Sequence, residues 1–184
     1  MRTASDVETK ANAHQHALLL GACCSALATL VPVALYQTGV LSRLPDPPMS
    51  VFDSERITMS KAAHPLGIPD ALLGLASFGA TLTLAILARR HRTARPLLAA
   101  KIVLDASAAA FNAGRQVFSF GKLCSWCTGT AISVGVMAYA GRTTIHDTFS
   151  ESVAIGRKTA SGTYQIVEVP PIQTRVDSAT IHWK

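Results

Sequence analysis

Four long apolar segments, each close to the length that crosses a bilayer, constrain the fold of this chain more than any other feature. They run from about residue 17 to 40, 68 to 87, 97 to 118 and 123 to 140. A helix of about 20 apolar residues crosses about 30 Å of hydrocarbon. Of the 184 residues 49% are hydrophobic and only 15% are charged, whereas about a quarter are charged in soluble domains. The sequence therefore predicts an all-α integral membrane four-helix bundle.

The apolar segments divide the chain into three parts. Residues 1–14 are expected to form a cytoplasmic N-terminal segment, 15–142 a four-span membrane domain with a long outer loop between its first two helices, and 143–184 a cytoplasmic tail. The first apolar run is too long for a signal-peptide core and ends without a small-residue cleavage site, so it is interpreted as a retained span. The tail mixes charges and holds one β-like stretch, 163–169, before two prolines, which predicts partial disorder or a short strand.

The basic residues predict the orientation. The short connection 88–95 carries four arginines and no acid, so the positive-inside rule places it in the cytoplasm. The connection 41–67 balances three basic against three acidic residues, as an exported loop can. Both termini are then cytoplasmic, and the fourth span begins at the outer face. Because the positive charge gathers in one inter-helix loop, the net charge of +6 indicates topology, and no nucleic-acid partner is expected.

Cys124 and Cys127, at the start of the fourth span, are the sharpest chemical signal. Cysteines three apart at a helix start lie on neighbouring parts of one turn, close enough to form a disulfide. The unpaired N–H groups of the helix end and the nearby Lys122 are expected to lower a thiol pKa. This pattern favours thiol–disulfide exchange. A structural metal site and two inert thiols are the alternatives. Zinc prefers four closed ligands, so no metal ligands are assigned.

The other unusual residues allow plainer interpretations. Cys23 and Cys24 fall in the inner half of the first span, too far from the outer pair for the ~7 Å Cα limit of a disulfide, and are interpreted as helix-packing residues. Lys101 and Asp105 are four apart in the third span, as a functional pair or a buried structural pair would be. Three further polar residues approach the outer interface, where snorkelling explains them: Asn112, Arg115 and Gln116.

Two motifs resemble the vitamin K epoxide reductase family. In the first, Ser60 is followed by Gly-Ile-Pro at 67–69 and by Gly74 in the next span. The second is the Cys-Ser-Trp-Cys sequence at 124–127, which opens the last span. With four spans in the same orientation, the resemblance covers about residues 15 to 142. It implies a four-helix bundle around a quinone head group, with the CxxC at the mouth of the bundle.

The resemblance also implies roles for individual residues. Cys127 would face the quinone, and Cys124 would exchange with an incoming disulfide partner. Ser60 matches a serine beside the redox centre and joins the two cysteines as a catalytic residue. Asp70 matches an asparagine that bonds the quinone carbonyl in vertebrate members. Gly67 and Pro69 complete the expected quinone-binding set.

The family reaction in bacteria is oxidation of the CxxC by membrane ubiquinone or menaquinone. It is coupled to disulfide formation in exported proteins through a thioredoxin-like partner. The resemblance thus implies an integral protein of the bacterial inner or plasma membrane with its CxxC on the outer face.

One departure from the family pattern bears on the mechanism. Typical members carry two further cysteines in the outer loop, which relay electrons between the partner and the CxxC. The second should stand six residues before the signature serine, where this chain has Ser54. A tyrosine that some members carry four residues after the second redox cysteine is replaced by Ala131. We therefore expect a partner thiol to attack Cys124 directly. The alternatives are a degenerate member that binds quinone or a partner without turnover, and metal handling by the two cysteine pairs.

Overall fold

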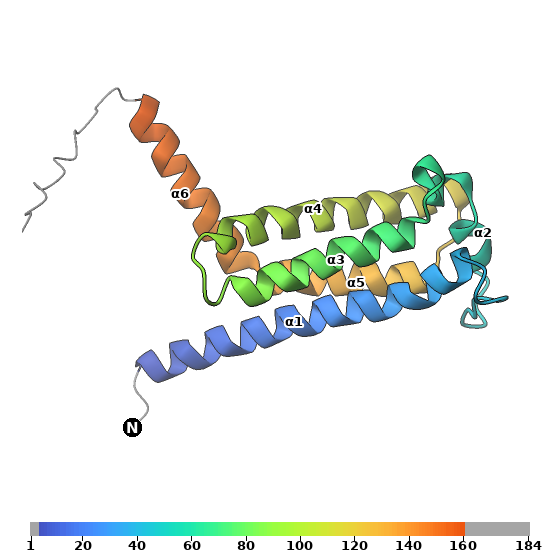
Figure 1. The fold of residues 1–184 in the computed structure, drawn as a ribbon, viewed down its shortest axis with the longest axis horizontal. Coiled ribbons are helices and arrows are strands. Elements are labelled where there is room, and N and C mark those ends of the chain that lie inside the picture. The colour runs from blue at the N-terminus through green and yellow to red at the C-terminus, as the bar shows by residue number, and fades with distance from the viewer. Residues whose placement is uncertain (1–3, 161–184) are drawn as a thin grey trace, which may run out of the picture.

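The computed structural model describes residues 4–160, whose regular structure is helical (Figure 1). Four long helices form a bundle: α1 (Ala4–Gln37), α3 (Asp70–Leu87), α4 (Ala94–Arg115) and α5 (Ser125–Ala140). The connection from α1 to α3 holds the short helix α2 (Ser54–Thr58) and the 3-10 turns η1 (Lys61–Ala63) and η2 (Pro65–Gly67). The last turn of α4 widens into the π-helix η3 (Gln116–Phe120), and α6 (Arg142–Ala160) follows α5. The predicted all-α bundle is confirmed.

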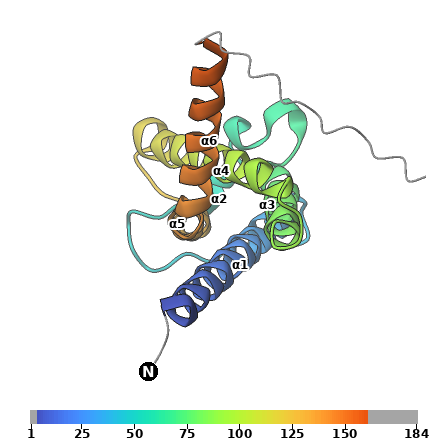
Figure 2. The ribbon, with the colours of Figure 1, turned by 90° about the vertical axis from the view of Figure 1, so that its left-hand side faces the viewer.

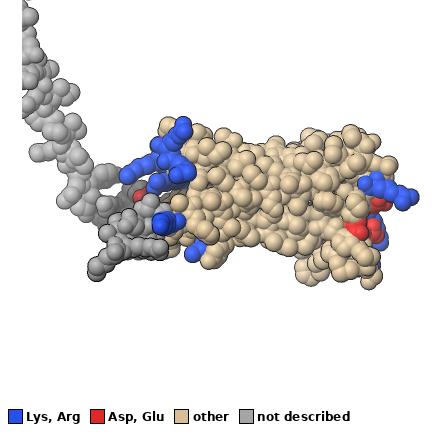
Figure 3. Space-filling view, turned by 90° about the horizontal axis from the view of Figure 1, so that it is seen from below, with Lys and Arg blue, Asp and Glu red and all other residues tan. Residues whose placement is uncertain are grey.

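Among residues 4–160, three segments are long and apolar enough to cross a membrane: Lys10–Gln37, Asp70–Leu87 and Ala94–Phe120. The fourth helix of the bundle, α5, is shorter, with 16 residues, and lies between α1 and α4. Figure 3 shows a side of the bundle that carries no Lys, Arg, Asp or Glu along its middle, with such residues gathered at the two ends. This distribution is the one that a bilayer requires, because a charge at mid-membrane costs about 2.5–3.5 kcal/mol even on insertion scales. The chain is an integral membrane protein.

Small and hydroxyl-bearing residues bring α1 and α5 close together. The Thr29 and Thr130 hydroxyls lie 2.9 Å apart, and Ser133 donates to the Ser25 hydroxyl at 3.0 Å. A Cβ on Gly129 would come within 3.1 Å of Thr29 Cγ2. Membrane helices associate through such close backbone approach and interhelical hydrogen bonds, because the hydrophobic effect gives them no preference for one another over lipid.

The connection between α1 and α3 covers the end of the bundle where α5 begins (Figure 1). Phe52 and Leu123 form an isolated parallel bridge, in which Leu123 N–H donates to Val51 O and Asp53 N–H donates to Leu123 O, both at 2.9 Å. Gly121, with φ +59°, ends the π-helix in the left-handed conformation and turns the chain toward this bridge. The loop is thereby attached to the residues directly before the CxxC.

Two segments differ from the prediction. The helix α1 begins at Ala4, well before the expected first span, so most of the N-terminal segment 1–14 is helical. The first part of the tail is the helix α6, where partial disorder or a strand was predicted. Figures 1 and 2 show α6 leaving the bundle at a steep angle, at the end where α3 and α4 are connected. Its helical period was missed because the tail was judged by its mixed charge. The β-like stretch 163–169 lies outside the described residues.

Candidate functional site

Cys124 and Cys127 occupy the first turn of α5. Cys124 is the N-cap of the helix, with an extended backbone (φ −90°, ψ 120°), and its Sγ accepts the N–H of Cys127 at 3.1 Å. Cys124 is 0% exposed, whereas Cys127 is partly exposed. The sequence correctly predicted that both thiols lie at the start of this helix. The sulfur of Cys124 thus takes the place of the oxygen that usually caps a helix.

A polar network from the loop covers Cys124. The Ser54 hydroxyl donates to Asp46 Oδ1 at 2.5 Å and accepts the N–H of Ser125 at 3.0 Å. The Ser125 hydroxyl donates to the same Asp46 oxygen at 2.6 Å, and the Ser54 N–H donates to Asp46 Oδ2 at 2.7 Å. Ser54 is 0% exposed and Asp46 is partly exposed, so the network leads from the buried first turn of α5 toward solvent.

Hydrogen bonds set the acidity of these two groups. Burial alone would raise the pKa of Asp46, but the hydrogen bonds from Ser125 and Ser54 outweigh it and lower that pKa. The pKa of Cys124, the N-cap residue of α5, is lowered. The Cys127 thiol donates a hydrogen bond to the Cys124 sulfur. This bond, together with the Ser54 hydroxyl and the Cys127 N–H, stabilises the Cys124 thiolate and outweighs burial, which alone would raise the pKa. The lowered thiol pKa agrees with the sequence prediction, but Lys122 is not its cause, because the Lys122 ammonium donates to Ser50 O.

Two further contacts hold the CxxC in place. Gln116, at the start of the π-helix, is 6% exposed, and its Oε1 accepts the N–H of Cys124 at 2.9 Å. The Trp126 indole N–H donates to Pro45 O at 3.0 Å. The CxxC turn, residues 124–127, is therefore fixed on one side by the end of α4 and on the other by the loop.

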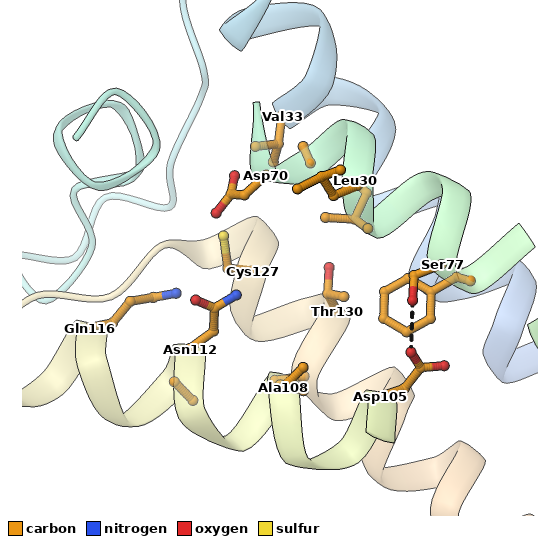
Figure 4. Close-up of a pocket in the computed structure, with 17 residues that line it drawn as sticks. Leu30, Val33, Asp70, Ser77, Asp105, Ala108, Asn112, Gln116, Cys127 and Thr130 are labelled. Atoms are coloured by element: carbon orange, nitrogen blue, oxygen red, sulfur yellow. Dashed lines mark hydrogen bonds between the residues drawn. The ribbon is translucent and has the colours of Figure 1, made fainter. Parts of the chain in front are cut away.

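Cys127 lines a cavity of about 290 Å³ between α1, α3, α4 and α5. Figure 4 shows polar side chains from two other helices around its sulfur, namely Asp70 from α3 and the amides of Asn112 and Gln116 near the end of α4. Much of the remaining wall is apolar, with Leu30, Val33 and several alanines among its residues. A second hollow of about 380 Å³ also reaches Cys127, and the exposed Val117 and Phe118 are part of its lining. A thiol at the polar end of an apolar cavity can react with a hydrophobic ligand.

Gln37, the last residue of α1, positions Asp70. Its amide nitrogen donates to Asp70 Oδ1 at 2.8 Å and to Thr58 O at 2.9 Å, and its oxygen accepts the N–H of Ala71 at 3.2 Å. One glutamine side chain therefore joins α1, the loop and the first turn of α3 beside the cavity.

The far end of the cavity carries a second polar group, shown at the right of Figure 4. Asp105 is 4% exposed and accepts hydrogen bonds from Ser77 at 2.9 Å, from Thr81 at 2.6 Å and from the Lys101 ammonium. The Lys101 ammonium also donates to the Ser77 hydroxyl at 2.7 Å. The predicted proximity of Lys101 and Asp105 is confirmed, and it extends to two hydroxyls of α3.

The other predicted site residues lie in the loop, outside the set of residues that line the two cavities. The Ser60 hydroxyl donates to Ile57 O at 2.7 Å, within its own turn. Gly67 has φ +80° and ends η2, and Pro69 is the N-cap of α3, so both shape the turn that leads to Asp70. Within the described residues, no three His, Cys, Asp or Glu side chains are grouped as a metal site would require.

Sequence reasoning missed three residues of this site. Asn112 and Gln116 were assigned to snorkelling, but Asn112 lines the cavity and Gln116 is buried against the CxxC, so that interpretation is wrong for both. Their helical spacing of four was the available signal, since it places both on one face of α4. No sequence pattern could have indicated Asp46, because this loop residue contacts Ser125, which lies 79 positions later in the chain, and such a contact follows no periodicity.

The fold and the site together define a polytopic membrane protein with a CxxC where the loop and the bundle meet. A family model described as "Vitamin K epoxide reductase family" matches residues 16–140. The chain belongs to the vitamin K epoxide reductase family, whose members are thiol/quinone oxidoreductases. No curated protein matches it.

Proposed function

We propose that the chain is a quinone-linked thiol–disulfide oxidoreductase that works without loop cysteines. The observation that carries the proposal is the position of Cys127, whose sulfur lies at the polar end of an apolar cavity (Figure 4). The other thiol, Cys124, is buried in the turn that the loop contacts through Ser54. The two thiols of one CxxC thereby meet two different environments, one suited to a membrane-soluble oxidant and the other suited to a protein dithiol.

The cavity fits the head group of ubiquinone or menaquinone in chemistry. Its walls between α1, α3, α4 and α5 are largely apolar, as a quinone ring requires. The amides of Asn112 and Gln116 can donate to a carbonyl oxygen beside Cys127. A quinone bound there supplies a two-electron oxidant for the dithiol. Asp70 is proposed to orient the head group, and Gly67 and Pro69 to hold the turn that presents Asp70.

The proposed cycle uses Cys124 for exchange. A partner thiolate attacks Cys124 Sγ of the Cys124–Cys127 disulfide, and Cys127 leaves as a thiolate. The second partner thiol attacks the partner sulfur of the mixed disulfide, which releases Cys124 and leaves the partner oxidised. A quinone bound in the cavity would supply the two-electron oxidant that restores the Cys124–Cys127 disulfide. A thioredoxin-like exported protein is the proposed partner. Ser60 is proposed as a catalytic residue because it matches the serine of the family motif.

The proposed location is a bacterial inner or plasma membrane, with the CxxC outside and both termini in the cytoplasm. Three arginines in the connection between α3 and α4, and Arg95 in the first turn of α4, support this orientation through the positive-inside rule.

Thiol trapping in membranes tests the proposal. A chain with Cys23→Ala and Cys24→Ala, which keeps only the CxxC, should be oxidised when quinone is present and reduced when quinone is depleted. A CxxC that stays reduced in both conditions would refute quinone-linked turnover. A degenerate binding protein would instead keep its cellular function when Cys124→Ala and Cys127→Ala are introduced.

A further inference from the structure

The helix α6 carries an apolar stripe that the bundle covers only at its start. Ile145, in the first turn of α6, is partly buried and packs against the core of the bundle. Phe149 and Val153 follow at intervals of four and are each 57% exposed. Residues four apart lie on one side of a helix, so these three side chains form a continuous α6 stripe. The stripe begins on the bundle and continues beyond it.

The two acidic residues of α6 lie on its opposite side. Asp147 and Glu151 are exposed, and they stand two positions after Ile145 and Phe149. Successive residues of a helix turn by about 100°, so both carboxylates point away from the α6 stripe. An amphipathic helix with one apolar side binds either a groove in a protein or the surface of a membrane.

The direction of α6 favours the membrane surface. The long axis of the bundle runs across the bilayer, because three of its helices are long and apolar enough to span it. Figures 1 and 2 show α6 leaving that axis at a steep angle, at the end where α3 and α4 are connected. A helix with this direction runs along the surface of the bilayer. The α6 stripe, which faces the bundle at Ile145, then faces the hydrocarbon beside the bundle at Phe149 and Val153.

Arginines at the same end of the bundle indicate the class of lipid. Arg142, the first residue of α6, donates to Tyr139 O at 3.0 Å, and its guanidinium lies 4.0 Å from the centroid of the exposed Tyr139 ring. Tyrosine and arginine are typical residues of the membrane–water boundary. Figure 3 shows Lys and Arg side chains gathered at this end. Four further exposed arginines lie in the α3–α4 connection and the first turn of α4: Arg89, Arg90, Arg92 and Arg95.

This charge distinguishes a lipid surface from a second copy of the chain. Basic clusters beside a membrane helix attract anionic headgroups. A second copy inserted in the same direction would bring its own arginines to the same end, and like charges would repel. The arginines and the α6 stripe therefore fit one occupant, a bilayer that contains anionic lipid.

We propose that α6 is an interfacial anchor. Its stripe enters the boundary between headgroups and acyl chains, and the arginines at this end of the bundle bind the phosphates of anionic lipids. The inference concerns a surface at the opposite end of the bundle from the CxxC and is independent of quinone chemistry.

Spin labels on the two sides of α6 test the anchor. A single cysteine is introduced into the full chain as Phe149→Cys or, as the matched control on the opposite side, as Glu151→Cys. Each nitroxide label is exposed to oxygen, which concentrates in hydrocarbon, and to a water-soluble nickel chelate. In nanodiscs of phosphatidylcholine mixed with phosphatidylglycerol, the oxygen-to-nickel accessibility ratio should be at least about threefold higher at 149 than at 151. The native cysteines are first removed by Cys23→Ala, Cys24→Ala, Cys124→Ser and Cys127→Ala.

Two results of the labelling experiment would overturn the proposal. Equal ratios at the two positions would mean that both sides of α6 lie in water. A label at 149 that is shielded from both reagents would mean that a protein surface, such as a second copy of the chain, covers the stripe.

Hydrogen exchange tests the lipid class in a chain that keeps its cysteines. The amides of α6 should exchange at least about threefold more slowly in the mixed discs than in phosphatidylcholine alone, because anionic lipid holds the helix on the surface. Arg89→Gln with Arg92→Gln should remove most of this difference. The matched control is Arg43→Gln with Arg56→Gln, two exposed arginines of the loop at the other end of the bundle, and it should keep the difference.

Equal exchange in the two lipids would refute the assignment to anionic lipid, and so would a difference that survives in the Arg89 and Arg92 variant. The discs carry the same lipid on both faces, so the orientation of the chain does not affect either measurement. Quinone dependence is measured separately by thiol trapping, so the anchor and the proposed function can fail independently.

Discussion

The polar side chains that surround Asp105 between α3 and α4 are those of Ser77, Thr81 and Lys101. Removing the carboxylate of Asp105 tests whether this polar cluster stabilises the fold. Asp105→Asn leaves the Lys101 ammonium without its counter-ion in the middle of α4. The side chains of Asp105 and Lys101 are 4% and 18% exposed. Breaking one side of a buried ion pair costs about 3–5 kcal/mol. Because Lys101 is partly exposed and its long side chain can turn toward a polar boundary, we expect the lower end, about 3 kcal/mol.

Two companion variants separate charge from packing. Thr81→Val removes one hydroxyl hydrogen bond to the Asp105 carboxylate and should cost about 0.6–1.7 kcal/mol, from the mean to the largest value measured between membrane helices. The double variant Lys101→Met with Asp105→Leu removes both charges and should fall within about 1 kcal/mol of the unmodified chain, as apolar replacements of buried pairs do.

The assay is reversible unfolding by SDS in mixed micelles, read as a free energy of unfolding for each variant. A loss below 1 kcal/mol for Asp105→Asn, or a double variant as unstable as the single one, would refute the structural interpretation. Quinone-driven oxidation of the CxxC in the double variant should stay near normal. Its loss in a stable protein would assign the cluster a functional role instead.

Three further predictions follow from single contacts. Gly141→Ala should lower the free energy of unfolding by about 1–3 kcal/mol, because its Cβ would lie 2.6 Å from Ile102 Cδ1 and 3.2 Å from the Met137 carbonyl, whereas Gly135→Ala, with nothing within 4 Å, should not. Asn112→Leu should raise the quinone concentration for half-maximal CxxC oxidation by about tenfold, as a lost hydrogen bond worth about 1.5 kcal/mol predicts; an unchanged value would remove Asn112 from the site. Asp46 has a lowered pKa in the folded state, so its contribution to stability is present above its ordinary pKa of 3.8 and is lost as the pH falls below that value. The melting temperature should therefore fall more steeply below pH 4 in the unmodified chain than in Asp46→Asn.

Apolar length and motif spacing were sufficient to predict the bundle and the location of the thiols. The predicted second span, 68 to 87, agrees closely with α3 (Asp70–Leu87), because the bilayer requires a particular apolar length and Pro69 and Asp70 mark a helix start. Cys124 and Cys127 were placed correctly because three residues span one turn of helix whatever the surroundings. Local rules of this kind do not depend on tertiary contacts.

Contacts made across the loop were not predictable in this way. Asp46 meets Ser54 and Ser125 through a backbone path whose direction is determined by the Phe52–Leu123 bridge and the left-handed Gly121. Ser54 was noticed only as a position where a cysteine was missing. The structure shows that the Ser54 hydroxyl accepts the N–H of Ser125, the residue after Cys124, so the loop and the CxxC turn are connected without a covalent bond.

A hydrogen-bonded cover over Cys124 has a measurable consequence, because a partner dithiol must displace it. Trp126→Phe keeps an aromatic side chain but removes the indole N–H that donates to Pro45 O. One such bond is worth about 0.5–1.5 kcal/mol, so the open population should rise by about two- to tenfold. If opening is fast compared with labelling, the rate at which a polar maleimide labels Cys124 follows that population.

The chain for this assay carries Cys23→Ala, Cys24→Ala and Cys127→Ser, which leaves one thiol. Tyr139→Phe, which removes a polar group from an exposed aromatic residue at the other end of α5, is the control and should leave the rate unchanged. Equal labelling in the Trp126→Phe chain would mean that Cys124 is reached by a route other than the loop, and direct exchange with a protein partner would then need a different surface.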